Sequence, residues 1–304
     1  MLFNKIKDQV FEDIEKIQKN TEYKGSEWSR LYLKAWDFFN YSKMEYANKD
    51  DIIFIRFPIH DSYRKFFDRV EWFYLPPICT LDKVAKAIDM AREQAKYDGM
   101  FFAMLGVPQE YVDLYQKDDL SIVDVEEQNE YLYNTSDLVE LKGKKYHSKR
   151  NHIAVFDKLY KSEFLPYKKE DRGEVEELFF KWEIGKGTSY DKDDEKSEYK
   201  AIQKSLDMAF DKDIYAYVLK VDGRIIGFTL GEITPSNVGI IHIEKADINY
   251  NGAYTKLMNM FAKEVLKDTK YINRQEDMGV DGIRQSKLSY KPCGYAMKYF
   301  LRDF

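Results

Sequence analysis

The chain has 304 residues, of which 44% are hydrophobic and 33% are charged, and its formal net charge is −5. A chain of this length buries one or two sizeable cores, and this composition excludes an intrinsically disordered or disulfide-stapled protein. The negative net charge argues against a surface that binds nucleic acid or anionic lipid over its whole extent. Phosphate contacts are therefore expected only at local basic patches.

Residues 1–17 repeat apolar side chains at helical spacing, which is unlike the charged-then-apolar order of a secretory signal. No stretch of the sequence approaches the roughly 18 uncharged residues of a membrane span. We therefore expect a cytoplasmic protein. Cys79 and Cys293 lie far apart without Cys or His at metal-ligand spacing, so we expect both to be reduced and packed.

The N-terminal half alternates between strand and helix patterns. These patterns predict a strand at 51–57, an aromatic segment closed by two prolines at 70–78, a helix at 81–99 and a strand at 100–107. This order favours a mixed or largely parallel sheet with helices against its faces, which belongs to the α/β (α+β) class.

The C-terminal half repeats the alternation more clearly. Two strand-like runs within 214–233 meet at Asp222-Gly223, a pair that tolerates the positive φ of a tight hairpin turn. The other predicted elements are a strand and a helix over 164–187, a polar loop at 188–196, a helix at 197–210, a strand at 238–246 followed by a helix, a short helix at 281–290 and a strand at 294–301.

The predicted strand at 238–246 carries most of the candidate chemistry. Alternate residues of a strand share a face, so His242 and Glu244 are expected on one face, about 7 Å apart at Cα, with Ile241 and Ile243 on the other. An amine loses a proton as it attacks an ester or thioester, and either titratable group can accept that proton. The alternative is a solvated strand face without a catalytic role.

Two other segments have the composition of anion-binding sites. Gly252 and Ala253 precede a helix, where small residues let backbone N–H groups approach a phosphate, although such a glycine also serves as a turn or cap. The basic segment at 142–152 can hold phosphates of a tRNA acceptor end, a cofactor or a lipid headgroup, or can simply be a solvated helix face. Arg284 and Lys287 lie three residues apart on one side of a predicted helix, facing solvent or an anionic donor.

Four motifs, LKGKKYHSKRNHI, HIEKAD, YINRQEDMG and IRQSKLSYKP, occur in this order along the chain. In these motifs the sequence resembles the C-terminal catalytic domain of bacterial phosphatidylglycerol lysyltransferases, and more closely the stand-alone relatives of that domain. The likeness extends from Glu27 to the C-terminus. It implies two tandem Gcn5-related N-acetyltransferase-like domains, at 1–141 and 161–304, joined by a basic bridging helix at 142–160, with the active cleft mainly in the second domain.

The resemblance also implies which residues form the site. The catalytic candidates are His242, Glu244, Asp247, Asn273 and Arg274. The donor-binding and anion-binding candidates are Lys149, Arg150, Asn151, Gly252, Ala253, Tyr254, Arg284 and Lys287. Further cleft candidates are Glu198, Lys245, Glu276, Asp277 and Tyr290.

Members of this family with membrane-embedded N-terminal regions transfer Lys or Ala from aminoacyl-tRNA to a lipid headgroup. We therefore expect an acyl or aminoacyl transferase with Glu244 or His242 as the base, and with Asn273, Arg274 and Lys287 at the donor. The expected co-substrate is aminoacyl-tRNA or acyl-CoA, without a metal or a tightly bound cofactor. The expected acceptor is a small amine, a peptide or a lipid headgroup, without stable membrane insertion.

Two alternatives stay open at this point. The first is an N-acyltransferase that uses acyl-CoA as its donor. The second is a non-catalytic module that binds a small amine or a nucleotide on the same fold, because a fold alone does not determine function.

Overall fold

The computed structural model describes residues 1–35, 43–59, 69–186 and 192–304. The chain divides into two compact units, and each is described by itself. The first unit comprises Met1–Tyr131, Glu276–Asp281 and Tyr295–Phe304, and the second comprises Leu132–Gln275 and Gly282–Gly294.

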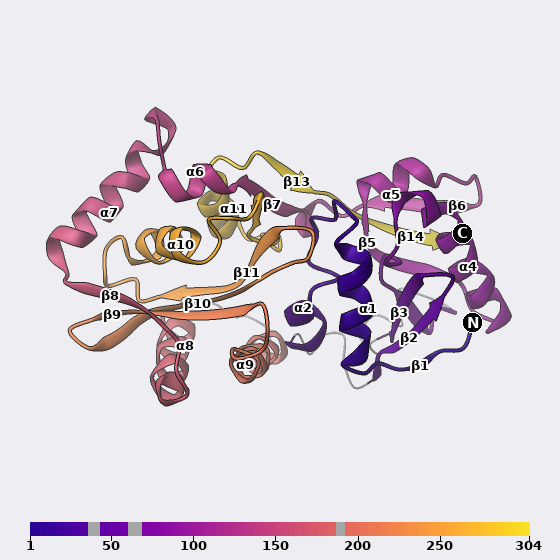
Figure 1. Ribbon diagram of the computed structural model, residues 1–304, viewed down its shortest axis with the longest axis horizontal. Helices are drawn as coiled ribbons and strands as arrows, with labels where there is room; N and C mark the ends of the chain where they lie inside the picture. Colours follow the sequence, from indigo (N-terminus) through magenta and orange to yellow (C-terminus); the bar gives the residue numbers. More distant parts are fainter. Residues whose placement is uncertain (36–42, 60–68, 187–191) are drawn as a thin grey trace. The chain divides into compact units, whose positions relative to one another are not determined.

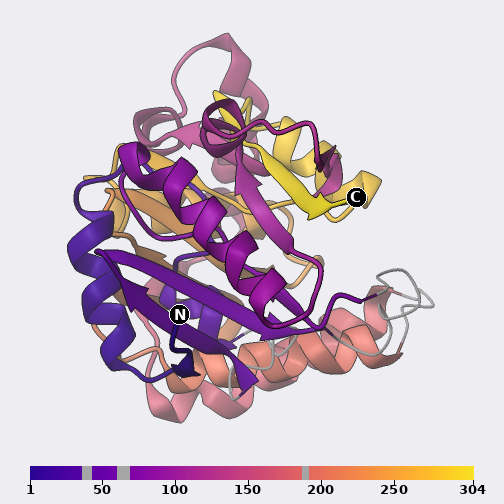
Figure 2. The ribbon, with the colours of Figure 1, turned by 90° about the vertical axis from the view of Figure 1, so that its right-hand side faces the viewer.

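The first unit is built on a seven-stranded mixed sheet in the order β1-β2-β3-β4-β5-β14-β6. Its strands are β1 (Asn4–Lys5), β2 (Glu45–Lys49), β3 (Ile52–Pro58), β4 (Trp72–Tyr74), β5 (Ala103–Pro108), β6 (Leu120–Asp124) and β14 (Lys298–Asp303). Its described helices are α1 (Gln9–Gln18), α2 (Arg30–Ala35), α4 (Val84–Tyr97) and α5 (Gln109–Leu114). Figure 2 looks onto this unit, with α1 in indigo and α4 in purple.

The core of the first unit is rich in aromatic side chains. The apolar stripe of α4, which includes Ala87, Ile88 and Ala91, is fully buried in the same cluster as the strand residues Phe54 and Phe73. Small residues on α4 let the helix approach the sheet closely, so the aromatic rings fill the remaining volume.

The second unit also has a seven-stranded mixed sheet, in the order β8-β9-β10-β11-β12-β7-β13. The strands of this sheet are β7 (Glu130–Asn134), β8 (Ser162–Pro166), β9 (Ile214–Val221), β10 (Arg224–Ile233), β11 (Val238–Ala246), β12 (Tyr271–Asn273) and β13 (Gly294–Ala296). The first two residues of β7 and the last two of β13 belong to the first unit. The helices of the second unit are α6 (Thr135–Glu140), α7 (His147–Leu159), α8 (Arg172–Lys186), α9 (Lys192–Asp207), α10 (Ala253–Glu264) and α11 (Asp281–Leu288).

Helices cover both faces of the second sheet. Figure 1 shows α10 on one face of β10 and β11, and α8 and α9 on the other. The basic helix α7 packs against α10 through the buried ring of Phe156, in a cluster with Leu257 of α10 and Ile226 of β10. The candidate residues of β11 are thus enclosed between two helical layers.

The two sheets have equivalent topologies. In each sheet the fourth and fifth strands are parallel, β4 with β5 and β11 with β12, and a helix, α4 or α10, connects them. In each sheet the sixth strand is antiparallel to the fifth, as β14 is to β5 and β7 is to β12. This correspondence supports the interpretation of the N-terminal half as a second copy of the C-terminal fold.

The sixth strands are exchanged between the two copies. The sixth strand of the first sheet, β14, comes from the C-terminus, and that of the second sheet, β7, comes from the N-terminal half. The units therefore differ from the predicted contiguous ranges 1–141 and 161–304, because backbone pairing assigns each of these strands to the opposite half. The predicted helix at 142–160 corresponds to α7, which lies within the second unit.

Several element predictions agree with the structure. The hairpin at 214–233 is confirmed as β9 and β10, and its turn residues Asp222 and Gly223 have φ values of 50° and 77°. The polar loop predicted at 188–196 lies partly outside the described residues, and its last part is wrong because α9 already begins at Lys192. No helix in the described ranges is long and apolar enough to cross a membrane.

The cysteine prediction is only half right. Cys79 is buried, and burial raises the pKa of its thiol to about 11, but Cys293 is exposed. The backbone N–H of Cys293 donates to the carbonyl of Leu132, just before the short strand β13. Pairing at the sheet edge thus uses the backbone of Cys293 and leaves its side chain at the surface.

Candidate active site

A β-bulge in β11 separates the two leading candidates. Leu230 of β10 pairs with Ile243, and the next residue, Gly231, pairs with Ile241, so His242 is an extra residue in β11. An added Cβ at Gly231 would touch Phe261 of α10, which places Gly231, and with it Ile241, on the α10 face. The prediction that Ile241 and Ile243 share one face is therefore wrong, because a bulge breaks the strict alternation of a strand.

Glu244 lies on the α10 face of the sheet. It pairs with Thr229, which lies between Gly227 and Gly231, and an added Cβ at either glycine would contact α10. Glu244 Oε1 accepts a hydrogen bond of 3.1 Å from Arg274 Nη2, and the two side chains are only 12% and 9% exposed. The two candidates form a buried ion pair.

This ion pair is incompletely satisfied. Among the described residues, Glu244 Oε2 and Arg274 Nη1 are buried without a hydrogen-bond partner. Burial opposes the charged form of Arg274, but the Glu244 carboxylate raises the pKa of the guanidinium above its ordinary value. A buried acceptor and donor that lack partners are costly, so this pair needs an explanation beyond packing.

The ring of Tyr290 lies near both Arg274 and a second cation, Lys149. The Arg274 guanidinium lies 4.7 Å from the centroid of the Tyr290 ring, and Lys149 Nζ of α7 lies 3.6 Å from it. Burial, followed by the positive charge of Arg274, lowers the pKa of Lys149 to about 8. Four predicted residues, Glu244, Arg274, Lys149 and Tyr290, thus come together on this face.

His242 belongs to a different group, on the opposite face. Its Nε2 lies 2.8 Å from Oε1 of Glu232, a strand residue next to Gly231 that faces away from α10. Its Nδ1 lies 3.1 Å from Nε2 of Gln275, and the side chain is 1% exposed. Both ring nitrogens are occupied, so this geometry favours Glu244 over His242 as the base.

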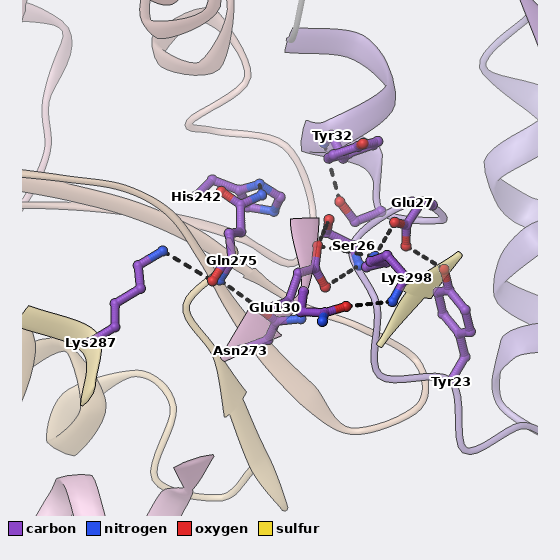
Figure 3. Close-up of polar contacts among 12 residues, drawn as sticks. Tyr23, Ser26, Glu27, Tyr32, Glu130, His242, Asn273, Gln275, Lys287 and Lys298 are labelled. Atoms are coloured by element: carbon purple, nitrogen blue, oxygen red, sulfur yellow. Dashed lines mark hydrogen bonds and ion pairs between the residues drawn. The ribbon is translucent and has the colours of Figure 1, made fainter. Parts of the chain in front are cut away.

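Asn273 and Lys287 support the position of Gln275. Asn273 is fully buried and its Oδ1 accepts from the backbone N–H of Gln275 at 2.7 Å, while Lys287 Nζ donates to the Gln275 carbonyl at 3.0 Å (Figure 3). Gln275 and Glu232 were not among the predicted site residues. The sequence could have indicated Glu232, because this residue is a single glutamate within the otherwise apolar strand segment GFTLGEI.

A third group surrounds Lys245 on the α8 and α9 side. Lys245 Nζ donates to Glu198 Oε1 at 2.6 Å and lies 3.3 Å from the centroid of the Trp182 ring. Both predicted residues of this pair, Glu198 and Lys245, are therefore together, but on the face opposite Glu244. Near the C-terminal end of β11, burial raises the pKa of Tyr254 to about 12.

The turn before α10 has a packing reason for its glycine. Gly252 has φ of 89°, and an added Cβ would lie 2.4 Å from the His152 carbonyl oxygen of α7. Ala253 is 1% exposed, and its N–H donates to the Tyr250 carbonyl. The close contact between α7 and α10 accounts for the small residues without a bound phosphate.

The remaining candidates of the second unit are dispersed. Arg150 donates to the carbonyls of Leu141 and Gly143, in the segment between α6 and α7, and Asn151 is exposed on α7. Arg284 is half-buried on α11. Asp247 accepts from the backbone and side chain of Asn249, as in a turn that a side chain stabilises.

Two predicted cleft residues belong to the first unit. Asp277 accepts from the Tyr131 hydroxyl at 2.6 Å and from the Gly279 N–H at 2.8 Å. The charge of Glu276 is one of the influences that raise the pKa of Lys298. Asp277 is buried in the first unit, and Glu276 is half-buried there.

The first unit also contains a buried charged cluster that the sequence did not indicate. Lys298 forms ion pairs with Glu27 and, at 3.3 Å, with Glu130, and all three side chains are less than 5% exposed. Tyr23 donates to Glu27, and Ser26 donates to Glu130 through its hydroxyl and its backbone N–H (Figure 3). We call Glu27, Glu130 and Lys298 the buried charge cluster.

Two mixed sheets of equivalent topology, each with a parallel central pair bridged by a helix, define the class of protein: a tandem α/β protein built from two copies of one fold. The family described as "Phosphatidylglycerol lysyltransferase, C-terminal" matches residues 41–302. The chain belongs to this family, which confirms the resemblance in the four motifs.

Three relatives illustrate this membership. An uncharacterised protein of Mycoplasmoides gallisepticum is 29% identical over 203 residues, 66% of this chain, and the chain spans 63% of that relative's length. A protein of unknown function from Bacteroides thetaiotaomicron is 25% identical, with a TM-score of 0.86 and 99% of each chain covered. The C-terminal domain of a putative lysylphosphatidylglycerol synthetase from Agrobacterium fabrum has the same fold at 12% identity, with a TM-score of 0.65, covering 97% of this chain and 91% of that one.

Proposed function

We propose that the chain is an aminoacyltransferase that moves an aminoacyl group from aminoacyl-tRNA to an amine or hydroxyl acceptor. Family membership supports aminoacyl transfer in general, because the family is described by a lysyltransferase activity. The acceptor class is a small amine, a peptide or a lipid headgroup.

One observation carries the proposal: the incompletely satisfied ion pair of Glu244 and Arg274. An acyl transfer needs an acceptor for the proton of the nucleophile and a donor for the oxygen that becomes negative. Glu244 Oε2 is such an acceptor, Arg274 Nη1 is such a donor, and within the described ranges neither atom has a hydrogen-bond partner. The two atoms belong to one ion pair, which supports a role of both at one reacting carbonyl.

The transfer then proceeds by addition and elimination. The nucleophile forms a bond to the carbonyl carbon of the aminoacyl ester and gives its proton to Glu244, while Arg274 stabilises the oxyanion. The intermediate breaks the bond between that carbon and the ribose oxygen, and Glu244 returns the proton to the leaving oxygen. The products are the aminoacylated acceptor and free tRNA, and no oxidant, reductant or metal takes part in this step.

Charge in the site suits an anionic donor. Glu244, Arg274 and Lys149 together carry one excess positive charge when all are ionised. Exposed basic residues on and before α7, such as Lys142 and Lys144, extend that charge along the surface of the second unit. A local basic surface of this kind favours tRNA phosphates although the whole chain is acidic.

The test compares two donors. Purified protein is incubated with a pool of charged tRNA or with a panel of acyl-CoAs, together with a lysate small-molecule fraction as acceptor. We expect protein-dependent loss of aminoacyl-tRNA that is sensitive to ribonuclease and declines steeply with salt. Release of thiol from acyl-CoA would instead support the acyl-CoA alternative, and inactivity with both donors would support a binding module.

A further inference from the structure

The first unit contains a cavity separate from the candidate active site. Its volume is about 340 Å³, and all of its lining residues belong to that unit. This size lies within the range of pockets that bind small molecules. Part of the wall, residues 20–25 and Trp28, precedes the region 41–302 that the family match covers.

Aromatic rings form much of the cavity wall and are held in place. Tyr23 and Trp28 are stacked, with ring centroids 3.7 Å apart and planes 13° from parallel. The Trp28 Nε1–H donates to the Pro76 carbonyl, and the Tyr111 hydroxyl donates to the Pro77 carbonyl. Tyr295, which is 43% exposed, lines the cavity near the surface. A ligand would therefore meet aromatic side chains that are already held in place, with little ordering of the protein.

The surroundings of the cavity carry an excess of negative charge. Lys298 lines the cavity, and its ammonium is bound to Glu27 and Glu130, so the buried charge cluster has two carboxylates for one cation. At the surface, the cavity is lined by the exposed Glu22 and Glu110 and by the half-buried Lys24. In these six groups, carboxylates outnumber cations by four to two.

The packing around Glu27 shows that the chain makes room for this charge. An added Cβ at Gly25 would lie 2.5 Å from Glu27 Oε2, and one at Gly106 would lie 2.7 Å from Glu27 Oε1. Burial raises the pKa of Glu27, and the charge of Glu130 adds to this effect against the lowering by Lys298. Another positive charge nearby would relieve this cluster.

We propose that this cavity binds a small organic cation, an ammonium group on a compact apolar body. Aromatic faces attract a cation through their quadrupole, and the excess of carboxylates adds to that attraction. The thiol of Cys79, which also lines the cavity, is buried, and its raised pKa keeps it protonated, so it contributes an apolar wall. The proposal is independent of the transfer reaction and of the second unit.

The experiment uses choline as the cationic probe and 3,3-dimethylbutan-1-ol as its neutral isostere. Binding to the full chain is measured by calorimetry and by saturation-transfer NMR. We expect choline to bind and the alcohol to bind at least about fivefold more weakly, since a desolvated cation–π contact contributes that much or more. Equal binding of both probes, or no binding of choline at millimolar concentration, would overturn the proposal.

Two variants locate the site, each with a matched control. Tyr295→Ala removes an aromatic wall, and Tyr97→Ala removes a tyrosine that is 87% exposed and does not line the cavity. Glu110→Gln removes a carboxylate at the cavity, and Glu93→Gln removes an exposed one elsewhere on α4. We expect both cavity variants to weaken choline binding several-fold and both controls to leave it unchanged; cavity variants that match their controls would refute this location.

Discussion

His242 and Glu244 are two residues apart on one strand, and both are largely buried, yet their surroundings differ. His242 has partners at both ring nitrogens, whereas Glu244 has one carboxylate oxygen without a partner among the described residues. The residue type and its burial do not distinguish a structural from a functional polar group here. The unfilled hydrogen-bonding capacity of Glu244 and Arg274 is the difference on which the proposed role of this pair in transfer rests.

The largest expected effect is on catalysis at Glu244. Glu244→Gln keeps an acceptor for Arg274 but removes the base, so the rate of aminoacyl transfer should fall by about 100-fold or more. The measurement is the rate of aminoacyl-tRNA deacylation with acceptor present, for protein that still unfolds cooperatively in urea.

The matched control for this variant is Glu163→Gln, which changes an exposed glutamate on β8 of the same unit. Its transfer rate should equal that of the unchanged chain. If Glu244→Gln retains full transfer, Glu244 is not the base, and the difference between the surroundings of His242 and Glu244 has no bearing on catalysis.

The next effect is on stability at His242. His242→Leu removes the contacts with Glu232 and Gln275, and loss of buried polar partners should lower the free energy of unfolding by about 1–3 kcal/mol. Transfer per folded molecule should change little. A variant of normal stability without transfer activity would reverse the assignments of His242 and Glu244, and His242→Gln, which keeps a donor and an acceptor, should recover part of the stability.

The turn after β11 tests whether its glycine is structural. Gly252→Ala should lower the free energy of unfolding by about 1–3 kcal/mol, because φ is 89° and the new Cβ would meet the His152 carbonyl. Gly223→Ala is the matched control, since φ there is 77° and no atom lies within 4 Å of an added Cβ. If urea unfolding gives the same decrease in the free energy of unfolding for Gly252→Ala and Gly223→Ala, the contact with α7 does not contribute to the effect.

The smallest effect concerns Lys149. Its folded pKa of about 8 lies below its ordinary value of 10.5, so between these values the unfolded chain holds the proton more often than the folded chain. The free energy of unfolding should therefore rise with pH from about 8 to 10.5. A difference of one bound proton between the two states would give a slope of roughly 1.4 kcal/mol per pH unit, and we expect a smaller slope because Lys149 is half-exposed.

Lys149→Met should remove this rise, as measured by urea unfolding at several pH values across the interval. Lys158→Met, an exposed position on the same helix, is the control and should keep it. If the free energy of unfolding of Lys149→Met still rises with pH over this interval, another group releases the proton on folding.

The fold was largely predictable because its signals are local. The hairpin at Asp222-Gly223, the apolar spacing of α4 and the strand before α10 are each set by neighbouring residues. The four motifs correctly indicated the family. The motifs also included Glu244, Arg274, Lys149 and Tyr290, which come together in the structure. The role of each residue in transfer stays a prediction.

The unpredicted features depend on contacts distant in sequence. The bulge at His242 arises from the register between β10 and β11, and no residue type in the motif HIEKAD predicts it. The buried charge cluster joins Glu27, Glu130 and Lys298 from three separate segments. Periodicity predicted the strand that contains Lys298, but it carries no information about which side chains meet.

The exchange of β7 and β14 sets an order for folding during synthesis. The second sheet receives its sixth strand from residues made before the rest of that sheet, whereas the first sheet lacks β14, which pairs with both β5 and β6, until residues 298–303 have been made. The N-terminal copy, although translated first, is therefore the last to close, and its β5 and β6 edges stay open to wrong pairing until that moment.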